Sequence, residues 1–196
     1  MIYIALLRGI NVSGQKKILM SDLKTLFENL EFSNVKTYIQ SGNVIFSSEE
    51  TNTGEIAKKI EEKIKAQYGF DVPVLVLTGE EIKNALDNNP YLKEVEILET
   101  QNLARLYVTF LSEVSEQKHL DKIDASLYAP DRFTIIEKSI FLHVVNGYGE
   151  TKLSNNFFES KLKVKATTRN WKTVQTLNQL VSLSGINAGV SDAENF

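Results

Sequence analysis

The sequence has no cysteine and no long apolar run, and each absence removes a class of protein. Without cysteine there can be no disulfides, no thiolate nucleophiles and no thiolate metal sites. No apolar segment approaches the ~20 residues that a membrane-spanning helix needs. The N-terminus also lacks a basic leader followed by a cleavable apolar stretch. We therefore expect a cytoplasmic protein with no membrane association, no metal and no cofactor.

Acidic residues are missing from both ends of the chain. The formal net charge of −3 argues against a protein that coats nucleic acid by bulk electrostatics. However, no Asp or Glu occurs in residues 1–21 or 160–191. These two segments carry the basic residues Arg8, Lys16, Lys17, Lys161, Lys163, Lys165, Arg169 and Lys172. An anionic partner would favour this distribution of charge.

The first part of the chain has the element order β-α-β-β-α-β. A hydrophobic content of 42% in 196 residues is sufficient for a substantial core, in one domain or two small ones. Periodicity and turn residues predict a strand over 2–7, a helix from Ser21 with Ser21 as its cap, strands Val35–Ile39 and Val44–Phe46, a helix capped by Thr53 and ending at Gly69, and a strand over Asp71–Leu77. This order is the ferredoxin-like one.

The second part repeats this order in outline. Thr78-Gly79-Glu80-Glu81 resembles a capping box, and it opens a short helix that ends at Asn88-Asn89-Pro90. The pattern then predicts a strand Leu103–Leu111, a helix Ser112–Ile123, strands Arg132–Ile136 and Ile140–Val145, a helix within Thr151–Lys163, a strand Val164–Thr168 and a last helix capped by Asn170. We therefore predict an α+β fold of two tandem ferredoxin-like halves, with 1–78 and 103–196 as the halves and 79–102 as a helix and linker.

Two polar insertions in the first half should meet at one end of its sheet. The loop after the first strand and the turn between the second and third strands lie at the same end in this topology. They carry the candidate ligand-binding residues Arg8, Asn11, Lys16, Gln40, Ser41 and Asn43. Guanidinium, ammonium, amide and hydroxyl donors together suit a carboxylate or a phosphate. The alternative is an ordinary hairpin turn in which Gln40 and Ser41 satisfy only the local backbone.

A second candidate site lies at Arg169 and Asn170. Asn170 as a helix N-cap leaves backbone N–H groups at the positive end of the helix dipole, and Arg169 stands beside it. We expect this pair to face the same cleft as the Arg8 loop. The alternative is a capped helix with Trp171 in the core. His119 on a charged stretch and His143 in an apolar strand do not form a catalytic set, so an enzymatic activity is left open.

Three motifs are similar to those of a known family. They are Ala5-Leu6-Leu7-Arg8-Gly9-Ile10-Asn11-Val12, Thr37-Tyr38-Ile39-Gln40-Ser41-Gly42-Asn43-Val44-Ile45-Phe46 and Ala166-Thr167-Thr168-Arg169-Asn170-Trp171-Lys172-Thr173-Val174. In this order they resemble the bacterial family catalogued as domain of unknown function 1697, although that family often has Asn at the position of Lys172. The resemblance implies a cytosolic α+β protein with tandem ferredoxin-like halves, and it implies no activity.

The leading hypothesis is a protein that binds a small anionic or phosphorylated ligand. One alternative is a nucleic-acid-binding module, because ferredoxin-like sheets can carry RNA on aromatic side chains such as Tyr3, Tyr38 and Phe46. Another is a protein–protein adaptor without a small ligand. The oligomeric state is left open by the sequence.

Overall fold

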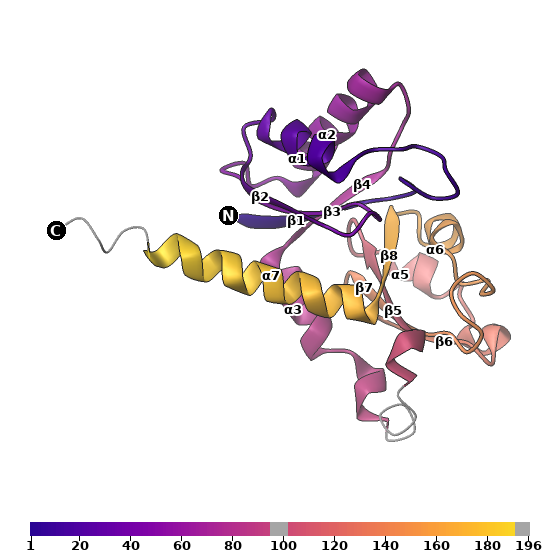
Figure 1. Ribbon diagram of the computed structural model, residues 1–196. Helices are drawn as coiled ribbons and strands as arrows, with labels where there is room; N and C mark the ends of the chain where they lie inside the picture. Colours follow the sequence, from indigo (N-terminus) through magenta and orange to yellow (C-terminus); the bar gives the residue numbers. More distant parts are fainter. Residues whose placement is uncertain (95–101, 191–196) are drawn as a thin grey trace. The chain divides into compact units, whose positions relative to one another are not determined.

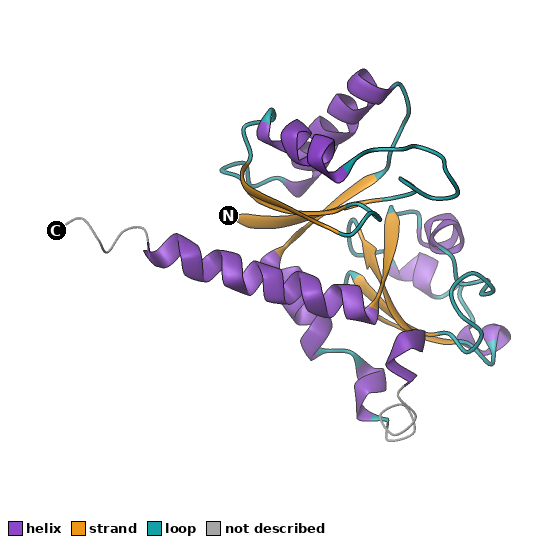
Figure 2. Cartoon of the chain, in the orientation of Figure 1, coloured by secondary structure: helices purple, strands orange, loops and turns teal. Residues whose placement is uncertain are grey.

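The computed structural model describes residues 1–94 and 102–190, with the backbone alone for 102 and 186–190. The chain is a mixed α+β protein with two four-stranded antiparallel sheets (Figures 1 and 2). Each sheet belongs to its own compact unit. The first unit joins Met1–Lys83 to the segment from Thr176 onward, and the second is Asn84–Gln175. The final helix therefore contributes residues to both units.

The first unit is built on a sheet with the strand order β2-β3-β1-β4. Its elements are β1 (Ile2–Leu7), α1 (Met20–Glu28), β2 (Ser33–Tyr38), β3 (Asn43–Ser47), α2 (Thr53–Tyr68) and β4 (Val74–Thr78), with parts of α3 (Gly79–Asp87) and α7 (Trp171–Val190). Helices α1 and α2 cover one face of this sheet (Figure 1). Tyr3, Ala5 and Leu7 alternate along β1 and are buried against these helices, as the period of two in a strand requires.

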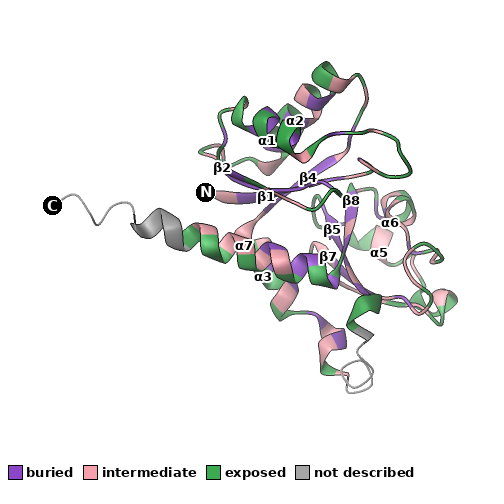
Figure 3. Cartoon of the chain, viewed as in Figure 1, coloured by how far each residue is buried: buried purple, intermediate pink, exposed green. Residues whose placement is uncertain are grey.

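The other face of this sheet lies against α7. Ile4 and Leu6 alternate along β1 with the residues that face α1 and α2, and they are fully buried, so β1 is apolar on both sides. Figure 3 shows most of β1 in the colour of buried residues. Lys36 Nζ lies 3.2 Å from Ser184 Oγ. A Cβ placed on Gly185 would lie 3.9 Å from Ile2 Cδ1. These two contacts place α7 against the strands β1 and β2 of the first unit.

The second unit has the equivalent strand order, β6-β7-β5-β8. Its elements are the 3-10 helices η1 (Pro90–Lys93), η2 (Asn102–Arg105) and η3 (Ala125–Tyr128), the helices α5 (Gln117–Leu120) and α6 (Asn155–Leu162), and the strands β5 (Leu106–Leu111), β6 (Arg132–Ile136), β7 (Ser139–His143) and β8 (Ala166–Asn170). Leu142 from the sheet, with Phe158 and Leu162 from α6, forms the centre of its core.

Two of the predicted caps at the ends of α1, α2 and α3 are wrong and two are confirmed. Helix α1 begins at Met20 after Leu19, and Ser21 Oγ instead lies 3.3 Å from a carboxylate oxygen of Asp22. Asn52, rather than Thr53, caps α2. The capping box at α3 is confirmed, because Thr78 N–H donates to Glu81 (2.8 Å) and Glu81 N–H to Thr78 Oγ1 (3.2 Å). Gly69 ends α2 in the left-handed conformation, as predicted.

The predicted helix over Ser112–Ile123 is much shorter in the structure. Only Gln117–Leu120 are helical. Ser112 N–H donates to the carbonyl of Lys165 and so extends the sheet. Ser115 Oγ donates to the carbonyl of Leu162 at 3.0 Å, a tertiary contact that the apolar spacing of the sequence does not predict. Predicted linker residues 95–101 lie outside the described part of the chain. None of the helices described is both long and apolar enough to cross a membrane.

Candidate functional site

The Arg8 loop and the Gln40–Asn43 turn lie side by side, as predicted. Leu7 N–H at the end of β1 donates to the carbonyl of Gly42 at 2.8 Å. The turn approaches so closely that a Cβ on Gly42 would lie 2.7 Å from Leu7 Cβ and 2.8 Å from Ile10 Cδ1. Gly42 has a φ of +79°, where glycine is favoured. The close contact thus depends on the smallest residue.

Asn11 joins the loop to the turn. Its amide nitrogen donates to the carbonyls of Ile18 (2.9 Å) and Gln40 (3.0 Å), and its amide oxygen accepts from Ile18 N–H (2.9 Å). Both donor hydrogens of the side chain are therefore used within the fold. Asn11 was predicted as a ligand-binding residue, and the geometry gives it a positioning role for the groups around it.

Asn43 has a similar role inside the turn. Its side chain is fully buried, and its amide nitrogen lies 3.0 Å from the carbonyl of Tyr38 and 3.1 Å from Ser41 Oγ. These contacts orient the Ser41 hydroxyl and close the β2–β3 turn. Burial leaves no surface through which Asn43 could touch a ligand in this conformation.

The groups that reach solvent here are basic or polar. Gln40, Ser41 and Lys17 are exposed, and Arg8 is half-buried. Lys16 Nζ donates to the backbone carbonyl of Asp71 at 2.6 Å. The Asp71 carboxylate pairs with Lys65 at 2.9 Å, so this neighbouring acid is already neutralised. This end of the sheet therefore presents positive charge and hydrogen-bond donors.

The second unit has the same backbone arrangement with different side chains. At the end of β5, Leu111 N–H donates to Lys138 O (2.8 Å) and Ser112 N–H donates to Lys165 O (3.0 Å). In the first unit the residue equivalent to Ser112 is Arg8, whose N–H donates to Pro73 O at 3.0 Å. The loop of the second unit continues with Glu113, so it lacks the basic character of the Arg8 loop.

Arg169 and Asn170 lie at the end of β8 in the second unit. Asn170 Oδ1 accepts from Thr173 N–H at 2.8 Å, which confirms Asn170 as the cap of α7. Arg169 is buried, and its Nη1 donates to the carbonyl of Thr168 at 3.0 Å. Burial lowers the pKa of Arg169 to about 10, so the guanidinium is still charged at neutral pH. That these two residues face the same cleft as the Arg8 loop remains a prediction.

A polar cluster that the sequence analysis missed lies on the second sheet. Arg132 binds both carboxylate oxygens of Glu94 at 2.7 and 3.2 Å, and its guanidinium lies 5.1 Å from the Tyr91 ring centroid. The Tyr91 hydroxyl lies 3.3 Å from Thr134 Oγ1, and burial raises the Tyr91 pKa. These residues come from η1, its C-cap and β6, and no local sequence pattern links these segments.

His143 completes this cluster. Its Nδ1 lies 3.3 Å from Arg132 Nη2. Since arginine only donates, Nδ1 accepts, and the neutral ring carries its hydrogen on Nε2. Nε2 is buried, with no hydrogen-bond partner in the described part of the chain. Burial and the charge of Arg132 lower the His143 pKa. The histidine is half-buried, and its contact with Arg132 holds the ring in this tautomer.

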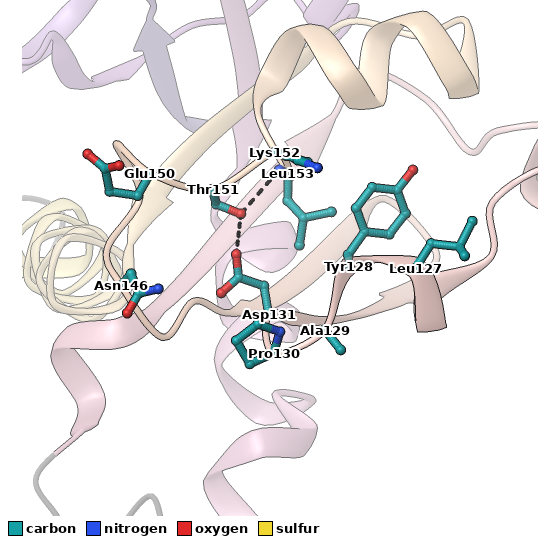
Figure 4. Close-up of a pocket in the computed structure, with 10 residues that line it drawn as sticks. All are labelled: Leu127, Tyr128, Ala129, Pro130, Asp131, Asn146, Glu150, Thr151, Lys152 and Leu153. Atoms are coloured by element: carbon teal, nitrogen blue, oxygen red, sulfur yellow. Dashed lines mark hydrogen bonds between the residues drawn. The ribbon is translucent and has the colours of Figure 1, made fainter.

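A pocket of about 180 Å³ lies between two loops of the second unit (Figure 4). Asp131 holds these loops together, because its carboxylate accepts from Val145 N–H (2.9 Å) and from the Thr151 hydroxyl (2.6 Å). Tyr128, Glu150 and other residues complete the lining. Both oxygens of Asp131 are thus already bonded, so this wall of the pocket offers a ligand little that is unused.

Another pocket of about 390 Å³ lies at the end of the first sheet that is opposite the Arg8 loop. Its lining combines Lys59 with Glu31, Glu49 and Glu50. Acids outnumber bases there, so it does not suit the anion predicted from the sequence.

Two of the three aromatic side chains that were expected to stack on RNA bases are buried in the structure. Tyr3 and Phe46 are fully buried, with ring centroids 5.8 Å apart, in the core beneath α1 and α2. Tyr38 is half-buried. A base could not stack on Tyr3 or Phe46 in this fold.

Comparisons with known proteins give a family and a fold. The model of the family described as "Protein of unknown function (DUF1697)" matches residues 1–141. The structure is similar to that of the conserved bacterial protein SP0830 from Streptococcus pneumoniae, with 25% sequence identity and a TM-score of 0.67. This similarity covers 92% of this chain and 98% of the other. No curated protein matches.

Proposed function

The chain belongs to the DUF1697 family of proteins of unknown function, and we propose that it binds a small anionic or phosphorylated ligand. The proposed site is the end of the first sheet where the Arg8 loop meets the Gln40–Asn43 turn. The observation that carries the proposal is the Asn11 side chain, which closes its own loop with two hydrogen bonds to Ile18 and fixes that loop to the turn with a third to the carbonyl of Gln40. Such preorganisation lowers the cost of ordering the groups that a ligand contacts.

Each residue has a distinct role in this proposal. Arg8 provides charge, since a guanidinium has five donors and can bind two oxygens of one anion. The exposed side chains of Gln40 and Ser41 donate hydrogen bonds. Asn11 and Asn43 position these groups without touching the ligand. Lys16 contributes positive charge from the Asp71 side of the loop.

We also propose that the units derive from two ferredoxin-like halves, 1–78 and 103–196, joined by 79–102, and that the protein is cytoplasmic. Equivalent strand orders in the two sheets support the duplication. So do the matching backbone bonds from Leu7 and Leu111 to the hairpin turns. Only the first of the two units combines this scaffold with a basic loop, which favours a single anion site of this kind.

The test is a titration of wild type and Arg8→Gln with inorganic phosphate, nucleotides and phosphosugars, read by thermal shift and calorimetry. Loss of a charge-assisted hydrogen bond costs about 1.5–3 kcal/mol. We therefore expect Arg8→Gln to bind about 10- to 100-fold more weakly. Arg105→Gln is the matched control, because Arg105 is an exposed arginine of the second unit.

Melting temperatures without ligand show whether each variant is folded. If no anion stabilises wild type more than Arg8→Gln, the proposed function is wrong. Equal losses in Arg8→Gln and Arg105→Gln would indicate general charge attraction and would also contradict it.

A further inference from the structure

Three exposed aliphatic residues are next in sequence to Asn11 or to a residue that Asn11 binds. Val12 follows Asn11 directly, Leu19 follows Ile18, and Ile39 precedes Gln40. Ile18 and Gln40 are the two residues that Asn11 binds. The exposed fractions are 57% for Val12, 69% for Leu19 and 47% for Ile39. Single exposed aliphatic residues are common, but here three of them lie on backbone segments that the Asn11 side chain holds together.

Ile39 occupies its position against the local preference of the backbone. Its φ is +49°, in the left-handed region. Glycine and asparagine readily adopt this conformation, whereas a β-branched residue is rare and strained there. Burial does not compensate for this strain, because nearly half of the side chain is exposed. Neither the turn nor the core therefore explains an isoleucine at this position.

The Val12 loop is also well defined. Asn11 N–H donates to Lys16 O at 3.2 Å, and Gln15 N–H donates to Val12 O at 2.9 Å. These bonds close a tight turn that displays Val12 beside the basic residues Lys16 and Lys17. The apolar surface and the positive charge thus belong to one short segment.

We propose that the anion bound at this site is amphiphilic, a phosphate or carboxylate that carries an alkyl or aryl group. The inference rests on the proposed function and specifies its ligand. Arg8, Gln40 and Ser41 would hold the anionic group. The alkyl or aryl group would cover Ile39, Val12 and Leu19 and remove their apolar surface from water.

The test compares methyl phosphate with hexyl phosphate by calorimetry, below the concentration at which the longer ester forms micelles. Partial burial of five additional methylene groups should make hexyl phosphate bind at least about tenfold more tightly. Hexanol is the control for apolar contact alone and should bind much more weakly than hexyl phosphate.

Variants separate the apolar contact from the fold. Ile39→Asn should retain or raise the melting temperature, since asparagine tolerates a positive φ, and it should reduce the preference for hexyl over methyl phosphate several-fold. Val12→Thr should reduce the preference in the same direction. Val114→Thr is the matched control, because Val114 is 61% exposed on the loop after β5 in the second unit.

The outcomes distinguish this inference from the proposed function. Arg8-dependent binding of both esters with equal affinity would overturn the inference and leave the proposed function intact. Absence of binding by either ester would overturn the inference, and the titration with nucleotides and phosphosugars would then decide the proposed function separately. A parallel arm with phosphatidylcholine vesicles, with and without phosphatidic acid, identifies the source of the amphiphile. Hexyl preference with sedimentation on the anionic vesicles indicates a lipid, and hexyl preference without it indicates a soluble ester.

Discussion

Gly42 and Gly14 have almost the same backbone conformation and very different surroundings. Their φ values are +79° and +76°. A Cβ on Gly42 would lie 2.7 Å from Leu7 Cβ, which is fixed to the backbone of β1, whereas a Cβ on Gly14 would meet nothing within 4 Å. The two positions therefore separate the cost of a left-handed conformation from the cost of a steric clash.

We expect Gly14→Ala to lower the free energy of unfolding by about 1–2 kcal/mol, the cost of a left-handed alanine. Gly42→Ala adds a clash in a packed region and should lower it by about 2–4 kcal/mol. Urea denaturation of both variants measures the difference. Equal losses would show that the turn can move away from Leu7, and so contradict the close contact described above.

At the scale of elements, substitutions at the start of α2 test which residue caps the helix. Asn52 Oδ1 accepts from Gly54 N–H (3.0 Å) and Glu55 N–H (3.2 Å). Asn52→Ala removes both bonds and should lower the free energy of unfolding by about 1 kcal/mol. Thr53→Ala, at the residue predicted as the cap, should change it by less than about 0.5 kcal/mol. Chemical denaturation measures both, and a larger loss in Thr53→Ala would refute the assignment.

Elements governed by local chemistry could be predicted from the sequence. The Thr78–Glu81 capping box and the Gly69 helix end involve residues close in sequence, and both are confirmed. The cap of α2 was misplaced by one residue, because Asn52 and Thr53 are both good cap residues. The prediction of a helix over Ser112–Ile123 failed because tertiary hydrogen bonds to Lys165, just before β8, and to Leu162 in α6 compete with helix formation.

The candidate site was predictable in position but not in the roles of its residues. Strand order alone placed the Arg8 loop beside the Gln40–Asn43 turn. The use of Asn11 as a clamp depends on a partner 29 residues away, and no local pattern encodes such a contact. The exposed aliphatic residues were overlooked because Val12 and Leu19 carry no periodic signal, and because Ile39 was assigned to the strand that in fact ends at Tyr38.

At the scale of the whole molecule, His143 should make stability depend on pH. Its folded-state pKa lies below the ordinary value of 6.5, chiefly because of burial and then because of Arg132. Below pH 6.5 the unfolded chain therefore binds more protons at this residue than the folded chain does. By linkage, the contribution of His143 is complete above pH 6.5 and is lost as the pH falls through the folded pKa.

We expect wild type to lose more stability than His143→Gln between pH 7.5 and pH 5. Urea denaturation at several pH values measures this difference. The lowered carboxyl pKa values of Glu50, Glu116 and Asp124 act at more acidic pH, and they are common to both proteins. Parallel pH profiles for the two proteins would exclude His143 as a source of the dependence.

Because part of α7 belongs to the first unit, the first unit is completed after the second during synthesis. The first unit lacks the part of this helix from Thr176 onward until the 92 residues of the second unit, Asn84–Gln175, have been made. At about 5–20 residues per second, the ribosome needs about 5–20 s for that stretch. During this interval the face of β1 with Ile4 and Leu6 lacks this part of α7. A nascent chain of this protein therefore exposes apolar surface that the complete chain buries.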